Sequence, residues 1–170
     1  MKLLVGLGNP GEENKNNRHN VGFMVVDGLS NEKWSSVRKF QSLIIKKEQE
    51  FILAKPQTYM NSSGKAVKKI VDHFKIKTSD LWVIHDDLDI SLGDFKIQKG
   101  KGPRLHKGVI SIEKELGKSD FWRVRVGVEN RDPENRIPGE AYVLQDFKEE
   151  EMEIIKSVVN EISKELLINE

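Results

Sequence analysis

The chain has 170 residues, of which 37% are hydrophobic and 32% are charged, and its formal net charge is +1. This length predicts one domain with a substantial core, and the apolar content excludes an intrinsically disordered protein. The chain has no cysteine, which excludes a disulfide scaffold, a thiolate nucleophile, a cysteine-ligated zinc site and an iron–sulfur cluster. We therefore expect a single domain over residues 1–170.

The hydrophobic stretches are too short for a membrane protein. The longest of them, Val21–Val26, is far below the roughly 18 residues that a membrane-spanning helix needs. The apolar run at the start of the chain breaks at Asn9-Pro10, too early for a secretory signal peptide. We therefore expect a soluble, cytoplasmic protein with no membrane contact.

The charges are unevenly distributed along the chain. Residues 94–107 hold five Lys or Arg and one acid, whereas residues 146–170 hold eight acids and three Lys. A single short basic run is most often a solvated surface, but this one contains Gly100 and Gly102 and ends beside Gly108. We interpret it as a candidate phosphate-binding loop that could orient an anionic partner.

Hydrophobic patterns place alternating strands and helices in the first half of the chain. We expect a buried strand at Lys2–Leu7, a helix at Val21–Leu29, and a hairpin formed by Leu43–Ile45 and Phe51–Ala54. A helix then follows Asn61 and Ser62, which stand at its N-cap. Its apolar residues recur at helical spacing: Val67, Ile70, Val71 and Phe74.

The second half continues the alternation. Strands are expected at Leu81–Ile84, at Phe95–Ile97 and around Val124–Val128. The last helix carries an apolar stripe from Met152 to Leu166, and Asp146 with Glu149 forms a plausible capping pair at its start. The pattern predicts an α/β fold: a single-domain, three-layer α/β/α arrangement with a twisted, mixed, mostly parallel sheet.

Two of the expected strands end in polar residues that suggest a catalytic site. The first strand leads to Asn9 and then to His19, and the strand at Leu81–Ile84 leads directly into His85-Asp86-Asp87. Sites in such sheets form beyond the carboxyl ends of neighbouring strands, so Asn9, His19 and Asp86 could converge. A carboxylate that fixes the histidine tautomer, beside an amide, could activate water to hydrolyse an ester or amide.

Other motifs are weaker. Ser62 and Ser63 lack the G-x-S-x-G elbow of serine hydrolases. Gly6–Gly11 matches the G-x-G-x-x-G pattern, but no amphipathic helix follows and Pro10 removes an amide donor, so we expect no nucleotide cofactor. His85 is expected to be structural, and His106 to touch either substrate or solvent. The four histidines show no metal-ligand spacing, so no metal site is expected.

Five segments of the chain occur in an order typical of one family: LVGLGNPG at 4–11, RHNVG at 18–22, KPQTYMNSSG at 55–64, HDDLD at 85–89 and FWRVRVG at 121–127. Together they resemble the bacterial-type peptidyl-tRNA hydrolases over nearly the whole chain. The resemblance implies a single-domain, monomeric enzyme that works without metal or organic cofactor. Its reaction would be hydrolysis of the ester between a peptide and the 3′ end of tRNA, which returns free tRNA to translation.

The resemblance also implies roles for individual residues. His19 would be the general base, Asp86 its orienting partner, and Asn9 the group that positions water or the substrate carbonyl. The substrate, meaning the peptide and the acceptor stem of the tRNA, would be bound by a further set: Asn14, Met60, Asn61, Lys99, Lys107 and Arg125. Within that set, Arg125 would clamp the 5′ phosphate of the tRNA, a contact that positions RNA without reading its bases.

The chain departs from the family pattern at three of its positions. Lys107 stands where the family has a substrate-binding Asn, Asn14 where it commonly has Tyr, and Gln98 where a Lys would share the phosphate clamp, although Lys99 is adjacent. A cation at position 107 is expected to lower the basicity of His19. We expect hydrolysis slower than in a typical family member, or an altered grip on the substrate. The alternative interpretation is an RNA-binding relative with weak or no hydrolase activity.

Overall fold

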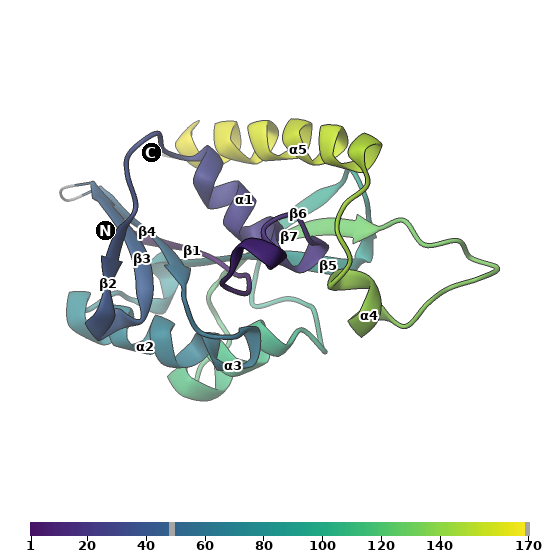
Figure 1. Cartoon of the computed structure of the whole chain (residues 1–170). Coiled ribbons are helices and arrows are strands. Elements are labelled where there is room, and N and C mark those ends of the chain that lie inside the picture. The colour runs from purple at the N-terminus through teal and green to yellow at the C-terminus, as the bar shows by residue number, and fades with distance from the viewer. Residues whose placement is uncertain (48–49, 169–170) are drawn as a thin grey trace.

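A mixed sheet of seven strands forms the centre of the computed structural model, which describes residues 1–47 and 50–168 (Figure 1). The strands follow the order β2-β3-β4-β1-β5-β7-β6 across the sheet. Their bounds are β1 Lys2–Gly6, β2 Ser35–Val37, β3 Ser42–Lys47, β4 Phe51–Pro56, β5 Leu81–Ser91, β6 Phe95–Lys99 and β7 Trp122–Glu129. The four central strands β4, β1, β5 and β7 are parallel, and the edge pairings β2–β3, β3–β4 and β6–β7 are antiparallel.

Helices cover both faces of this sheet. Their bounds are α1 Val21–Gly28, α2 Ser63–Phe74, α3 Lys107–Leu116, α4 Gly139–Val143 and α5 Glu149–Ile168. Figure 1 shows α1 and α5 on one side of the strands, and α2 and α3 on the other. The single-domain, three-layer α/β/α fold expected from the hydrophobic pattern is confirmed, with the parallel strands gathered at the centre of a mixed sheet.

Alternation along the central strands builds two hydrophobic cores. In β1, Leu4 packs into the core beneath α1 and α5, whereas Leu3 and Val5 pack into the core beneath α2 and α3. Successive side chains of a strand point to opposite faces, so a strand covered on both sides must be apolar at every position. This requirement explains why β1 and the first residues of β5 appear in the sequence as continuous apolar runs.

The expected hairpin and most expected elements are confirmed, but β5 differs from expectation. We expected this strand to end at Ile84, where the apolar run stops. It continues to Ser91, and its pairing with β7 includes Asp86 opposite Val126 and Asp87 opposite Gly127. Backbone hydrogen bonds to a neighbouring strand hold these polar residues in extended conformation, and hydrophobicity cannot reveal such bonds. Residues 48–49, between the two strands of the hairpin, lie outside the described part of the chain.

The cap of the last helix also differs from expectation. The backbone N–H of Lys148, the residue before α5, donates to Glu151 Oε2 at 2.8 Å, so Glu151 caps the helix and the pair Asp146–Glu149 does not. Asp146 instead forms a β-bridge with Asn17. At α2, Ser62 does occupy the N-cap position, but its side chain makes no capping hydrogen bond.

Two further features bear on function. Gly11 is followed by a single 3-10 turn, Glu12–Asn14, and not by the long helix whose N-terminus would bind a pyrophosphate. Among the residues that the structure describes, no helix is long and apolar enough to cross a membrane.

Candidate active site

The end of β1 lies beside the middle of β5, where the apolar run of that strand gives way to polar residues. The two strands are parallel neighbours with Gly6 opposite Ile84, so the turn after β1 passes beside the polar residues of β5. His19 lies in the one-turn 3-10 helix η2 (Arg18–Asn20), which directly precedes α1. This arrangement brings a side chain from before α1 over the middle of β5.

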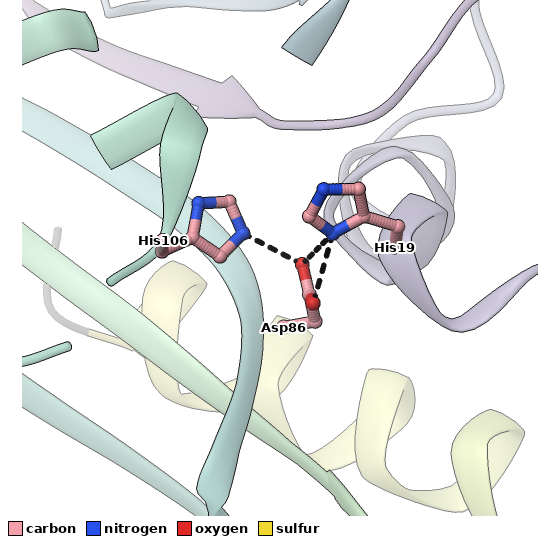
Figure 2. A group of neighbouring side chains, drawn as sticks. All are labelled: His19, Asp86 and His106. Carbon is pink, nitrogen blue, oxygen red and sulfur yellow. Dashed lines mark hydrogen bonds and ion pairs between the residues drawn. The ribbon is translucent and has the colours of Figure 1, made fainter. Parts of the chain in front are cut away.

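Asp86 accepts hydrogen bonds from two histidines (Figure 2). His19 Nδ1 is 2.9 Å from both carboxylate oxygens of Asp86, and His106 Nε2 is 2.7 Å from Oδ1. The contact between His19 and Asp86 confirms that these residues meet, whereas the place of His106 was missed. His106 is buried rather than exposed to solvent.

Hydrogen bonding assigns the tautomers of both rings. His106 is the N-cap of α3, and its Nδ1 accepts from the backbone N–H groups of Gly108 and Val109 at 3.2 and 3.3 Å. That nitrogen therefore carries no proton, and Nε2 donates to Asp86. His19 uses Nδ1 toward Asp86, so its Nε2 points away with a free lone pair (Figure 2). A histidine directly before an amphipathic helix was the one sequence signal for this cap.

The charged and buried groups of the site shift the pKa values of Asp86 and His19. Burial alone would raise the pKa of Asp86, but attraction and hydrogen bonds from His19 and His106 hold it well below its usual range. Burial alone would lower the pKa of His19, but the attraction and hydrogen bond of Asp86 outweigh burial and raise it above 6.5. The Lys107 ammonium lowers the pKa of His19, as expected, but this effect is the smallest of those acting on the ring and does not cancel the rise.

His19, Asp86 and His106 also form a group with metal-like spacing that the sequence did not reveal. Their potential ligand atoms all lie within 4.8 Å of one another. However, both ring nitrogens that face Asp86 carry protons, and a cation there would have to displace these protons. Moving the proton of His106 to Nδ1 would also break the cap of α3. The hydrogen-bond pattern thus favours proton transfer over metal binding.

Asn9 is held by hydrogen bonds to two other segments of the chain. Its Oδ1 accepts from the backbone N–H of Met60 at 2.8 Å, which links the turn after β1 to the turn after β4. Its backbone N–H and C=O are both bound by the Asn20 side chain at 2.9 Å. Within the described residues, Asn9 Nδ2 makes no hydrogen bond and remains able to donate. Since Asn20 adjoins His19, Asn9 is tied to the same turn as the histidine.

A surface cavity of about 330 Å³ opens beside Asn9 and Asn20. Its lining also includes Phe23 of α1 and Lys55 of β4. Neither His19 nor Asp86 lines it, so Asn9 is the one member of the expected catalytic group that borders this space.

The substrate-binding residues implied by the resemblance fall into two groups, one around the start of α3 and one on β6 and β7. Asn14 lies separately, in the 3-10 turn Glu12–Asn14. Met60 and Asn61 lie in the 3-10 turn after β4, Met60 buried and Asn61 exposed. A Cβ atom placed on Gly108 would lie 2.6 Å from Met60 Sδ, so the glycine allows the start of α3 to approach this turn. Lys107, the first residue of α3, forms an ion pair with Glu140 of α4 at 2.9 Å.

Arg125 belongs to the second group and already has two partners. Its Nε donates to Asp87 Oδ2 and one terminal nitrogen donates to Gln98 Oε1, each at 2.7 Å. Gln98 therefore orients Arg125. Lys99 is exposed at the end of β6. Asn14 uses its side chain internally, donating to Pro10 O at 2.9 Å and accepting from Asn17 at 3.2 Å.

His85 has the structural character expected of it. It is fully buried, and its Nδ1 donates to the backbone carbonyl of Asp86 at 2.7 Å. Burial and the neighbouring His106 lower the pKa of His85 to about 3, so it is neutral near pH 7.

The fold and these side chains define an α/β protein with a carboxylate-oriented imidazole able to take a proton from water. Comparison with known proteins gives the family. The family model of peptidyl-tRNA hydrolase matches residues 3–169. The peptidyl-tRNA hydrolase of Aliarcobacter butzleri is 43% identical over 169 residues, covering 95% of this chain and 90% of the relative. That of Mycoplasmoides gallisepticum is 39% identical over 161 residues, covering 94% and 86%.

Solved structures agree with the sequence comparison. The crystal structure of peptidyl-tRNA hydrolase from Acinetobacter baumannii superposes with a TM-score of 0.87 at 28% identity, covering 96% of this chain and 85% of that one. The chain belongs to the peptidyl-tRNA hydrolase family.

Proposed function

We propose that this protein hydrolyses the ester bond between a peptide and the 3′ end of tRNA, with water as the nucleophile. The observation that carries the proposal is the hydrogen bond from His19 Nδ1 to Asp86, which leaves Nε2 as an oriented base. Membership of the peptidyl-tRNA hydrolase family supports peptidyl-tRNA as the substrate.

The mechanism follows from the tautomer. His19 Nε2 takes a proton from water while the water oxygen bonds to the ester carbonyl carbon, which gives a tetrahedral oxyanion. The oxyanion collapses, the bond to the ribose oxygen breaks, and that oxygen takes the proton from His19. The products are a peptide with a free carboxyl group and a tRNA with a free 3′ end. Asp86 stabilises the imidazolium between the two steps.

Asn9 supplies the donor that this reaction needs. Because Oδ1 is held by Met60, Nδ2 has one orientation and is available to bind the attacking water or the developing oxyanion. A donor held in place before the reaction costs no reorganisation during it.

The other site residues would bind the substrate on either side of the ester. Met60 and Asn61 would contact the peptide beside Asn9, with Lys107 close to the ester. Arg125 and Lys99, on β7 and β6, would bind phosphates of the tRNA. Asn14 would act through the turn that it stabilises. We further propose a monomeric, cytoplasmic enzyme that needs no metal or other cofactor.

The RNA-binding alternative is not favoured, because a protein that only bound RNA would not need an oriented base. One comparison separates the two functions. Purified protein is incubated with an N-acetylated aminoacyl-tRNA, and release of the acylated amino acid is measured. We expect turnover by the unchanged protein, loss of turnover in His19→Ala, and salt-dependent tRNA binding retained in that variant.

His73→Ala is the matched control, since His73 is an exposed histidine on α2 outside the site. Its turnover is expected to match that of the unchanged protein. If the unchanged protein binds tRNA but releases no product, the binding function replaces the hydrolase.

A further inference from the structure

The catalytic histidine lies in an element too short to hold itself in place. The 3-10 turn Arg18–Asn20 has three residues, and an isolated helical turn of this length is unstable in water. Yet His19 Nδ1 is held 2.9 Å from both oxygens of Asp86. Contacts outside the turn must fix its position.

Arg18, the residue before His19, makes the largest set of such contacts. Its buried guanidinium donates to the backbone carbonyls of Gln145 and Asp146 at 3.1 and 3.0 Å, and to Glu151 Oε2 at 2.7 Å. The guanidinium carbon lies 4.0 Å from the centre of the Tyr142 ring. One side chain thus joins η2 to the segment after α4 and to the first turn of α5.

Glu151 is itself fixed from several directions. Besides Arg18, its carboxylate accepts from the backbone N–H of Lys148 at 2.8 Å and from Asn130 Nδ2 at 3.0 Å. The side chains of Arg18 and Glu151 are each only 3% exposed. A buried ion pair contributes little net stability, but the planar fork of arginine imposes geometry on its partners. The arrangement is therefore better suited to setting a position than to stabilising the fold.

We propose that Arg18 and Glu151 are positioning residues for the hydrolysis, fixing the turn that carries His19 to the start of α5. The inference rests on the proposed function. Two backbone hydrogen bonds support it, from Arg18 N to Gln145 O at 3.1 Å and from Phe147 N to Asn16 O at 3.0 Å. On the other side of His19, Asn20 binds the backbone of Asn9, so the histidine is anchored on both flanks.

The test is a double variant, Arg18→Met with Glu151→Gln. Removing one partner alone would leave a buried unpaired charge and could unfold the protein, whereas this pair leaves none. The amide oxygen of Gln can still accept from the backbone N–H of Lys148, and its NH2 group then faces Asn130, whose side-chain oxygen can accept once that amide is rotated. We expect kcat to fall about 10- to 100-fold, because small misplacements of a reacting group have effects of this size, while KM changes less than about twofold.

Titration of His19, followed by NMR of its ring, separates positioning from stability. The groups that act on His19 are Asp86 on β5, His106 before α3 and Lys107 on α3. The double variant removes one charge of each sign, so a fall in the pKa of His19 reports a looser contact with Asp86. We expect that fall in the double variant, and a smaller one in Arg18→Lys, since an ammonium cannot reach all the acceptors together.

Ile162→Ala, a buried α5 residue in the core beneath α1, is the matched control for destabilisation. It should lower the free energy of unfolding and leave kcat and the His19 titration unchanged. Unchanged kcat and titration in the double variant would overturn the positioning role. If the unchanged protein proved inactive, the proposed function would fail, while the titration would still decide whether Arg18 and Glu151 position His19.

Discussion

A single carboxylate organises the residues of the candidate site. Asp86 accepts from two imidazoles that come from segments far apart in the chain, and each of those rings has a defined tautomer. The two carboxylate oxygens of Asp86 face two N–H donors, so each of these polar groups has a hydrogen-bond partner. Replacing Asp86 by an isosteric amide would turn one acceptor into a donor and break this match.

Asp86→Asn should therefore reduce kcat by about 10²- to 10⁴-fold with little change in tRNA binding. With the amide oxygen in the place of Oδ1, the NH2 group takes the place of Oδ2 and faces His19 Nδ1, so the N–H at that nitrogen is no longer favoured and His19 loses its fixed tautomer. A single-turnover assay and a tRNA-binding titration would check the two parts. A rate within about threefold of the unchanged protein would contradict the proposed role of Asp86.

The raised pKa of His19 predicts a pH dependence. Only the neutral ring can take a proton, so activity should rise with pH and reach half its maximum above pH 6.5. Asp86→Asn removes the attraction that raises this pKa, so its residual activity should rise at lower pH. Profiles of kcat/KM against pH would show both shifts. If the unchanged protein reached half its maximal activity at or below pH 6.5, that result would contradict the prediction.

Lys107 gives a prediction specific to this chain. Its positive charge disfavours the imidazolium form of His19, although Glu140 pairs with it at 2.9 Å. On the alkaline plateau of the pH profile, where His19 is neutral, Lys107→Asn should increase the single-turnover rate by up to about fivefold, the effect that an exposed charge has on its surroundings. Lys114→Asn, on the same helix, serves as the control. Equal rates with Lys and Asn at position 107 would remove the hypothesis.

At the scale of elements, close contact of α1 with the end of β1 and the middle of β5 positions the turn that carries His19. A Cβ atom on Gly22 would lie 2.4 Å from Ile84 O and 2.5 Å from Leu7 N. The same two backbone groups form the hydrogen bond from Leu7 N to Ile84 O at 2.9 Å. The helix after His19 can therefore approach the sheet this closely only because its second residue is glycine.

Gly22→Ala should lower the free energy of unfolding by about 1–3 kcal/mol and also reduce kcat, because α1 must move away from the sheet. Gly117→Ala is the comparison, since Gly117 has φ +64 and its Cβ would meet nothing within 4 Å. That variant should lose about 1 kcal/mol from backbone strain alone and keep its kcat. Denaturant unfolding and turnover assays would separate them. Equal kcat values for the two variants would contradict the seating of His19 by α1.

At the scale of the whole molecule, charge is separated between the strands of the site and the last helix. Lys96 and Lys99 lie on β6 at one edge of the sheet, and the first turn of α5 carries Glu149, Glu150 and Glu151. A field of this kind favours approach of polyanionic RNA to the basic edge.

Lys96→Glu with Lys99→Glu should weaken tRNA binding, raise KM, and reduce the slope of log K against log salt by about two, with kcat at saturation unchanged. Lys65→Glu with Lys68→Glu on α2 makes the same change in net charge at another place. Binding titrations at several salt concentrations would compare them. Equal weakening by the two pairs would show that the basic edge has no special part.

The sequence by itself determined the three-layer α/β/α arrangement and indicated which residues could activate water. Continuous apolar runs placed the central strands, helical spacing placed α1, α2 and α5, and polar residues at strand ends pointed to Asn9, His19 and Asp86. These signals are local, because burial on one or two faces leaves a periodic trace in the chain. The family motifs around these residues indicated the substrate, peptidyl-tRNA.

Only the tertiary structure decided how those residues are held. It brought in His106, extended β5 through Asp86, gave Arg125 its partners Asp87 and Gln98, and joined Arg18 to Glu151. Each of these features is a hydrogen bond between segments far apart in the chain. A polar side chain shows in sequence that it needs a partner, but the partner is set by which segments the packed core brings within about 3 Å.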